Sequence, residues 1–485
     1  MSKAMQRALG VQLGLEDGDD TPEMSEAASE NAAISESAVE VADATDEVVA
    51  DDQAATELSE AHEKLEEVSE AIAEASENGG ISKEAAVFAH LAIKNACGRF
   101  YGPAFAAAVP SVESFYGDSG RRRNTQIALE GIGQMLKSFW QAIVRQIKKM
   151  WASVRNWYER VLGAAPRLKK KAQSLLAKSG NANGTAEEKD MDLNLMHALN
   201  ISGKAPKPSD AVSHIKALAT TTSAALGDET NGKYEGVFED FEKLIDAVEG
   251  LGDDKFKDKP AVPASGTTQG TTAYTAPKDL ATAYSSFSNE LTQVYETVRD
   301  RVMKPMTVSG TKNGSNDRFG TDLDYKQTNE MLGGSAIIVI EPRGTAPAEK
   351  VKVMRRTGPR FATYAVKPKD VDNSGSFKTM SGAEIRMVTE EVSDVCDHII
   401  TYKKSWEMRE KTEKKMEAAA NKAIANLEKD KDAPALKVRL IKDLASGTYG
   451  FLQNTVAFET HLINYSLKTC GALLNWCERS LAQYK

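Results

Sequence analysis

The 485 residues suffice for about two to four domains, with 41% apolar residues, slightly below the globular range, and 27% charged residues. The four cysteines form no C-x-x-C pair, which excludes a disulfide framework and a structural zinc site, so we expect free, buried thiols in a reducing compartment. No apolar run approaches the ~18–20 residues that span a bilayer, which indicates a cytosolic protein.

The charge is divided unevenly along the chain, although the whole carries only −9. Residues 1–80 hold 22 acidic and three basic residues, and residues 16–80 contain no aromatic side chain. Like charges repel and small side chains bury little surface, so we expect disorder there, with nascent helix at most around 57–77. We take residues 1–113 as an acidic leader or propeptide, largely disordered, with an Ala-rich helical part at 81–110.

Residues 114–180 have the opposite sign, with 14 basic against three acidic residues and three of the five tryptophans. Their apolar residues recur every three or four positions, which predicts a Trp-rich amphipathic helix ending at Pro166. The apolar face comprises Ile132, Leu136, Phe139, Ile143, Ile147, Met150, Val154, Trp157 and Val161, and the basic face Lys137, Arg145, Lys148, Lys149, Arg155 and Arg160.

This helix has three interpretations that remain open. Its stripe can pack on neighbouring helices with the cations in water, its basic face can bind nucleic-acid phosphates, or its tryptophans can lie at a membrane surface.

After a linker at 179–190, helical and β patterns alternate. Periodicity of three to four predicts helices near 191–202, 209–226, 235–251 and 280–303, and three β-branched runs predict strands at 335–341, 350–356 and 361–367. The seam Ile385–Trp406 opens a long charged helix, and Pro434 separates it from a C-terminal helix. The fold class is therefore mainly α, a helical bundle with long helices plus a small β unit (α+β). Its parts are a helical region at 191–303 with a low-complexity loop at 252–279, a small β unit at 335–368, and the long helix and C-terminal helix at 380–485.

No motif marks an active site. The GDSG run at 117–120 is followed by Arg121 and lacks an all-β context, so a flexible hinge explains it better than a serine nucleophile. DVDNSGS at 370–376 resembles the start of a calcium loop, but position twelve is Ser381, and turn chemistry accounts for the same residues. We expect no catalytic residue, cofactor or metal, and no enzyme.

Two stretches resemble the internal head proteins of phiKZ-like giant bacteriophages: FYGDSGRRRNTQIALEGIGQMLKSFWQAIVRQIKKMWASVRNWYERVLG and LLNWCERSLAQYK. The resemblance extends over about residues 87–485, and the leader is similar only in composition. It implies a structural virion protein, made in the host bacterial cytoplasm and packaged inside the capsid with the genome. The implied partners are double-stranded phage DNA, a maturation protease, other internal head proteins or the capsid interior, and further copies of the chain.

The resemblance also implies that the leader is removed by cleavage after a small residue-x-Glu motif. Ser111-Val112-Glu113 fits this motif between Pro110 and a Gly/Ser segment, and we favour it. Other triplets also fit, among them Ala28-Ser29-Glu30, Ala38-Val39-Glu40, Ala75-Ser76-Glu77 and, at the start of the predicted helix, Ala128-Leu129-Glu130.

Cleavage after Glu113 would leave 55 basic and 46 acidic residues, which changes the net charge from −9 to +9. A basic body can associate with DNA without reading its sequence. The residues that we expect to contact phosphates are Arg121, Arg122, Arg123, Arg145, Lys148, Lys149, Arg155, Lys169, Lys170 and Lys171.

Two alternatives belong to other classes. The chain can be ejected with the genome and act on the host membrane through its Trp helix, or it can be an assembly scaffold that self-associates through the seam Ile385–Trp406.

Overall fold

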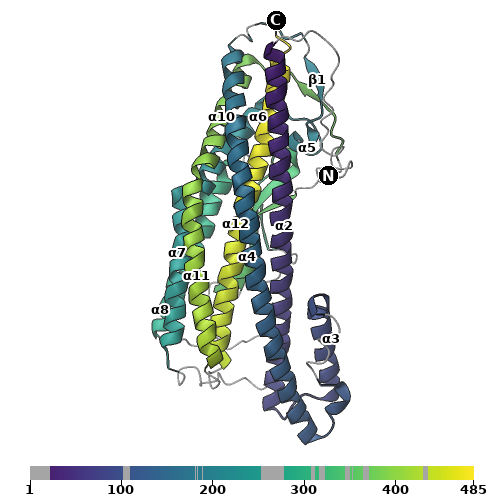
Figure 1. Cartoon of the computed structure of the whole chain (residues 1–485), viewed down its shortest axis with the longest axis vertical. Helices are drawn as coiled ribbons and strands as arrows, with labels where there is room; N and C mark the ends of the chain where they lie inside the picture. The colour runs from purple at the N-terminus through teal and green to yellow at the C-terminus, as the bar shows by residue number, and fades with distance from the viewer. Residues whose placement is uncertain are drawn as a thin grey trace. The chain divides into compact units, whose positions relative to one another are not determined.

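Long helices dominate the computed structural model, which describes residues 22–101, 110–180, 182, 184–187, 189–252, 278–306, 312–315, 323–344, 350–351, 353–363, 371–429 and 435–484. Two helices, α2 (Pro22–Glu77) and α4 (Asp118–Ser179), each pass through both of the compact units into which the chain divides (Figure 1). Residues 46–157 form what we call the leader-containing unit; the described residues up to Thr45 and from Tyr158 onward form the C-terminal unit.

The leader-containing unit packs leader helices on the first half of α4. Its elements are the end of α2, α3 (Lys83–Tyr101), the short helix η2 (Val112–Ser114) and α4 up to Trp157. Leader residues such as Leu65, Ile72 and Ile93 share one buried cluster with Ile132 and Phe139 of α4. The first part of the amphipathic stripe expected on α4, namely Ile132, Leu136 and Phe139, is therefore buried in a cluster with leader side chains.

A glycine turn joins the leader to the start of α4. Gly79 and Gly80 have positive φ values of 101° and 94°, which a side chain rarely adopts. A Cβ on Gly80 would lie 2.8 Å from the carbonyl carbon of Arg121, and the N–H of Ile81 donates to Thr125 Oγ1 at 3.0 Å. The turn thus fixes the leader against the first turns of α4.

The leader differs from the sequence-based expectation. Residues 22–77 form one helix rather than a disordered segment, and residues 61–97 contribute to a packed core. The physical reason is that the apolar partner lies outside the segment: Leu65 and Ile72 bury their surface against α4, which the composition of residues 16–80 does not reveal. Residues 1–21 lie outside the described residues.

The helix α4 also differs from its prediction at both ends. It begins at Asp118, so the GDSG segment supplies its first turn rather than a flexible hinge, and it passes through Pro166 to Ser179. A proline inside a helix costs about 3 kcal/mol. Here Ala165 and Leu168 beside it are buried, and this packing holds the helix together.

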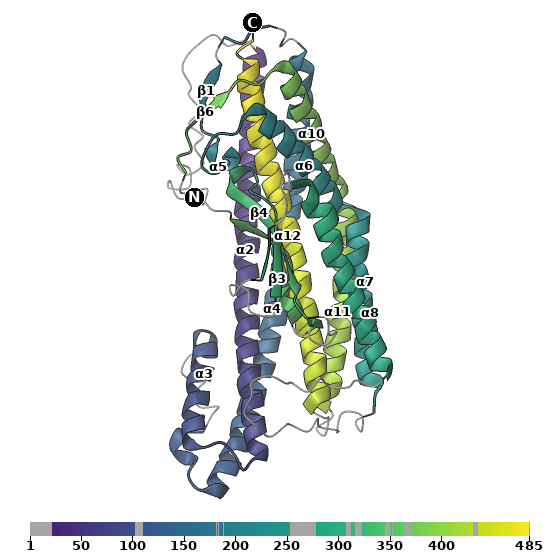
Figure 2. The same cartoon turned by 180° about the vertical axis from the view of Figure 1, so that it is seen from behind.

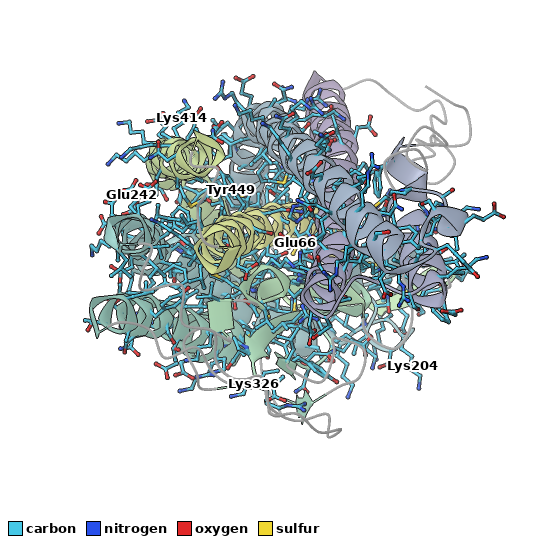
Figure 3. All side chains as sticks on the ribbon, turned by 90° about the horizontal axis from the view of Figure 1, so that it is seen from below. Glu66, Lys204, Glu242, Lys326, Lys414 and Tyr449 are labelled. Atoms are coloured by element: carbon cyan, nitrogen blue, oxygen red, sulfur yellow. The ribbon has the colours of Figure 1, made fainter. Side chains whose placement is uncertain are left out.

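The C-terminal unit is a helical bundle around α12 (Ala435–Leu481), which contacts the helices that surround it. These are α6 (Pro208–Leu226), α7 (Asp228–Gly250), α10 (Gly382–Thr401) and α11 (Lys403–Lys429), with α8 (Lys278–Thr297) packed on α7. Seen end-on in Figure 3, Tyr449 of α12 points inward while Lys414 of α11 and Glu242 of α7 lie toward the outside.

The predicted helices of this unit are largely confirmed. Those expected at 209–226, 235–251, 280–303 and 380–485 appear as α6, α7, α8 with the turn Val298–Met303, and α10 to α12. The seam on α10 is buried, with Ile385, Val388, Val392, Val395 and Ile399 fully covered where α10 packs on α6 and α12. It is therefore part of the chain's own core.

The small β unit is an antiparallel sheet in the order β2-β3-β4-β5 (Figure 2). Its strands are β2 (Lys312–Ser315), β3 (Leu323–Gln327), β4 (Ser335–Pro342) and β5 (Gly358–Thr363), with Ile338 opposite Arg360. A separate ladder pairs β1 (Asp190–Leu193) with β6 (Gly375–Lys378).

Of the three predicted strands, 335–341 is confirmed as β4, and 361–367 falls partly in β5, with residues 364–367 outside the described part. The strand expected at 350–356 is wrong, because this run ends in the helical turn Met354–Arg356, beside which Gly447 and Gly450 of α12 lie. The helix expected at 191–202 is instead strand β1 and the short helix α5 (Met196–Leu199). Most of the loop at 252–279 lies outside the described residues.

All four cysteines, Cys97, Cys396, Cys470 and Cys477, are free and buried, as expected. Burial raises the pKa of Cys97 to about 11, so this thiol stays protonated at neutral pH.

Candidate nucleic-acid interface

The predicted phosphate contacts lie along α4 in three groups. Arg121, Arg122 and Arg123 occupy its second turn, and Arg145, Lys148, Lys149 and Arg155 its middle. Lys169, Lys170 and Lys171 lie near its end, in the C-terminal unit. The apolar face that opposes them is buried wherever its side chains are described, as the periodicity predicts.

The first group is accessible to solvent. Arg122 and Arg123 are exposed, and Arg121 is half-buried with its Nη2 atom 2.9 Å from Asp118 Oδ1. An exposed ion pair of this kind contributes little to stability, so it leaves the arginine available to a stronger anion.

The middle group differs from residue to residue. Arg145, Lys148 and Arg155 are exposed on α4. Lys149 is exposed along most of its length, but its Nζ atom lies 2.7 Å from Oδ1 of Asp51, a leader residue. The pKa of Lys149 is raised, first because of this hydrogen bond and then because of the charge of Asp51.

The last group is committed to the C-terminal unit. Lys169 Nζ lies 2.6 and 2.8 Å from the carboxylate oxygens of Asp397. Lys171 is buried, with 7% of its side chain exposed, and donates to Asn475 Oδ1 and Glu478 Oε2 at 2.8 Å each. Its position fits a structural role, and we leave Lys171 out of the proposed contacts.

The cleavage motif lies in a surface turn. Ser111 and Glu113 are exposed, and Val112–Ser114 forms the helical turn η2. The residues that follow Glu113 anchor the turn. Phe115 is 2% exposed, and Asn124 Nδ2 donates to the Ser114 carbonyl at 2.6 Å. The peptide bond after Glu113 is thus near the surface, directly before a buried anchor.

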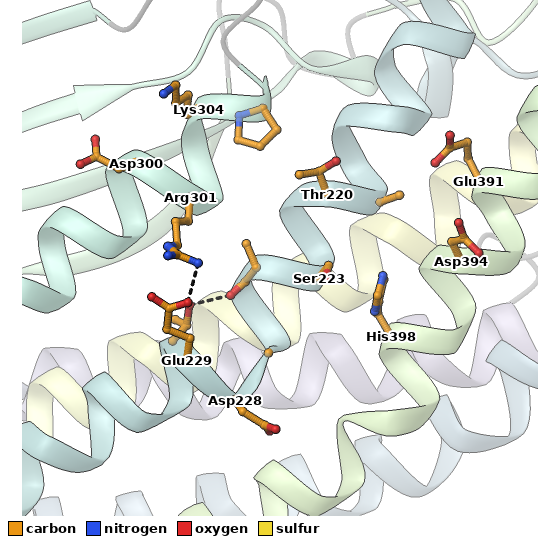
Figure 4. A pocket seen from close by; sticks show the side chains of 15 residues that line it. Thr220, Ser223, Asp228, Glu229, Asp300, Arg301, Lys304, Glu391, Asp394 and His398 are labelled. Atoms are coloured by element: carbon orange, nitrogen blue, oxygen red, sulfur yellow. Dashed lines mark hydrogen bonds and ion pairs between the residues drawn. The ribbon is translucent and has the colours of Figure 1, made fainter.

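A hollow of about 810 Å³ in the C-terminal unit is lined by charged side chains (Figure 4). Glu229 forms an ion pair with Arg301 at 2.5 Å, and burial, followed by the charge of Asp394, raises the pKa of Glu391. Among the described residues no three His, Cys, Asp or Glu side chains are placed to hold a metal ion. The hydroxyl of Ser223 and the imidazole of His398 both line the hollow, but the described residues show no hydrogen bond between these two side chains, and we assign the hollow no chemistry.

The calcium-loop resemblance is likewise explained by a turn. The N–H of Ser374 donates to Asp372 Oδ1 at 3.1 Å, and strand β6 begins at Gly375. Asp370 lies outside the described residues.

Sequence reasoning found the basic residues but missed the distant acidic partners of three of them. Asp51, Asp397 and Glu478 lie 98, 228 and 307 positions from their lysines. The sequence is rich in acidic residues, so nothing in it distinguished these three carboxylates.

No helix among the described residues is long and apolar enough to cross a membrane. The described residues form a predominantly helical protein with a cationic helix and a leader of opposite charge.

Comparison with known proteins gives the family. The model of the phiKZ-like phage internal head proteins matches residues 35–479, which is most of the chain, and the chain belongs to this family. It is thus a bacteriophage protein of the head interior. No curated protein and no solved structure gives a significant match.

Proposed function

We propose that the chain is a structural protein of the virion, packaged with the genome, whose acidic leader is removed after Glu113 to give a basic body that associates with DNA. The observation that carries the proposal is the exposed turn at Glu113, which lies between the acidic leader and the basic helix α4. Membership in a family of internal head proteins supports the location.

The charge of the two parts fits this sequence of events. The leader holds 24 acidic and six basic residues, and the rest carries +9. While the leader is attached, the net negative charge opposes contact with DNA, and its removal reverses the sign. Assembly of the protein and contact with DNA are thereby separated in time.

The turn at Glu113 can be reached by a protease at a modest local cost. Opening it requires loss of the hydrogen bond from Asn124 to Ser114 and withdrawal of Phe115 from its site. Such an opening is local, because the helices on either side do not have to unfold. By contrast, Glu130 of the triplet at 128–130 lies within α4, and Ala128 is fully buried.

The DNA contacts that we propose are electrostatic and independent of base sequence. Exposed Arg122, Arg123 and Arg145 are the cations of α4 that we expect to contact DNA first. Lys148 and Arg155 are also exposed but already interact within the chain, as do Arg121, Lys149, Lys169 and Lys170, and these residues join them to the extent that their present interactions can be exchanged for phosphate. Each phosphate contact contributes about 0.9 to the slope of log affinity against log salt, so five contacts would give a slope of about −4 to −5.

Mass spectrometry of purified particles tests the cleavage, and a salt titration of DNA binding by the trimmed protein tests the association. We expect the body to begin at Ser114, with no peptide that spans the bond between Glu113 and Ser114. Particles in which the leader is still joined to the body, or a trimmed protein whose DNA affinity does not fall with salt, would contradict the proposal.

The two alternatives receive less support. Trp157 is 1% exposed in the core of the chain, so it is not available to a membrane surface. The seam expected to drive self-association of a scaffold is covered by α6 and α12.

A further inference from the structure

One buried carboxylate of the leader contacts α4. Asp51 has only 4% of its side chain exposed, and among the leader side chains that the structure describes it is the buried acidic one. Its other acidic neighbours along α2, such as Glu60, lie toward solvent. Burying a carboxylate is costly unless hydrogen bonds replace water, so the contact must be specific.

Three donors of α4 surround this carboxylate. Oδ1 accepts hydrogen bonds from Lys149 Nζ at 2.7 Å and from Gln146 Nε2 at 3.1 Å, while Oδ2 accepts from Ser153 Oγ at 2.7 Å. The three residues are spaced by three and four positions, which places them on one face of the helix. Burial by itself would raise the pKa of Asp51, but the hydrogen bonds from Lys149, Ser153 and Gln146, together with the charge of Lys149, outweigh it and lower the pKa.

An ammonium, an amide and a hydroxyl are also the groups that proteins use to bind phosphate oxygens. In the full chain the two carboxylate oxygens of Asp51 stand where two oxygens of a phosphate could lie. We propose that Gln146, Lys149 and Ser153 form an oxyanion site for a phosphate group, which Asp51 occupies in the full chain and which opens when the leader is removed. This inference rests on the proposed function and gives it a defined site.

The position of Asp51 makes it an effective competitor. The cluster of Leu65 and Ile72 with Ile132 fixes α2 against α4, so the carboxylate is presented to its donors within one molecule. An intramolecular group acts at an effective concentration in the millimolar range, so an anion well below that concentration does not readily displace it. The leader would therefore block this site by occupancy, in addition to its general negative charge.

Acylation of individual lysines in the full chain, followed by mass spectrometry, tests occupancy without DNA. We expect Lys149 to react at least about threefold faster in Asp51→Asn than in the unmodified chain. The control Glu60→Gln removes the same charge from an exposed part of α2 and should leave Lys149 unchanged.

Inorganic tripolyphosphate then tests the ligand class. In Asp51→Asn it should slow acylation of Lys149 more than that of Lys148, and the additional change Ser153→Ala should weaken this protection. Equal reactivity of Lys149 in the unmodified chain and in Asp51→Asn, or equal protection of both lysines, would overturn the inference. Hydrogen exchange over residues 46–77 shows whether the leader remains docked in the variant. Where it does, the same protection experiment is made on a chain cut after Glu77 and Glu113, from which the leader has dissociated, and equal protection of both lysines there overturns the inference.

DNA binding separates this inference from the proposed function. In Asp51→Asn, adding Lys149→Gln should lower the salt slope by about one, whereas in the unmodified chain Lys149→Gln should leave it unchanged. Arg145→Gln, an exposed cation on the same helix, should lower the slope in both backgrounds. Selective protection of Lys149 without DNA binding by any form would refute the proposed function and retain the oxyanion site.

Discussion

Substitution of Leu65 by alanine tests whether the leader is a packed part of the protein. Leu65 lies in α2, is fully buried and belongs to the cluster that covers Ile132 and Phe139 of α4. Truncation of a buried leucine costs about 2.7–5 kcal/mol, because apolar surface is lost and a cavity remains. At about 3 kcal/mol, the equilibrium between the docked leader and its open state should shift roughly 150-fold.

Hydrogen exchange resolved by peptide measures this shift where it is expected. Amides at 127–139 of α4 should exchange about two orders of magnitude faster in Leu65→Ala, while amides of α12 in the C-terminal unit should not change. The control Leu91→Ala removes the same atoms from a leader side chain that is 50% exposed and should cost under about 0.5 kcal/mol. Unchanged exchange at 127–139 in Leu65→Ala would refute the packing of the leader on α4.

Three further predictions concern the C-terminal unit. Burial lowers the pKa of His214 from 6.5 to about 4, so the unfolded chain takes up this proton first. As the pH falls from 6.5 to about 4, His214 should therefore lower the free energy of unfolding by about 1.4 kcal/mol per pH unit. His214→Asn should remove this part of the pH dependence, which denaturant titrations at several pH values measure. Lys171→Met should destabilise the unit by roughly 1–3 kcal/mol, since Lys171 is bound to Glu478, and should leave the salt slope of DNA binding unaltered. Gly450→Ala should lower the melting temperature, because its Cβ would lie 2.5 Å from the Cβ of Arg355, and overpacking of this kind costs about 1–3 kcal/mol.

The sequence predicted those elements whose signal is contained in their own residues. The stripe of α4 is visible as a period of three to four, and the structure buries Ile132, Phe139 and Val154 as that period requires. Strand β4 was predicted from its run of β-branched residues, and the structure buries that run.

The errors fall where a distant partner decides the local structure. Residues 22–77 form a helix, and its second half packs although it is acidic, because α4 supplies the apolar surface that the segment lacks. The run at 350–356 alternates like a strand, but Gly447 and Gly450 of α12 let a helical turn approach closely. Asp51 could not be selected from the sequence, because its role depends on Lys149 and Ser153, about a hundred positions away.

Because the leader is packed on α4, cutting the chain is a different event from removing the leader. The leader contributes Leu65, Ile72, Ile81 and Ile93 to the buried cluster, and at about 1.5–3 kcal/mol for each large side chain this amounts to an upper bound of roughly 6–12 kcal/mol. A chain cut only after Glu113 should therefore keep its leader fragment bound.

A second cut, after Glu77, would divide the leader into two pieces that each keep some of the apolar contacts with α4. It falls beside the glycine turn at Gly79 and separates Leu65 and Ile72 from Ile81 and Ile93, so each piece retains about half of the apolar contacts. Site-specific protease sequences inserted at one or both positions allow native mass spectrometry to compare the two cases. We expect the fragment to remain bound after the single cut and to dissociate after both. In the uncut leader the two sets of contacts are linked and strengthen each other, whereas two separate pieces each bind α4 only through their own, weaker set. Immediate loss of the leader after the single cut would show that its apolar contacts with α4 are too weak to hold Asp51 in the oxyanion site.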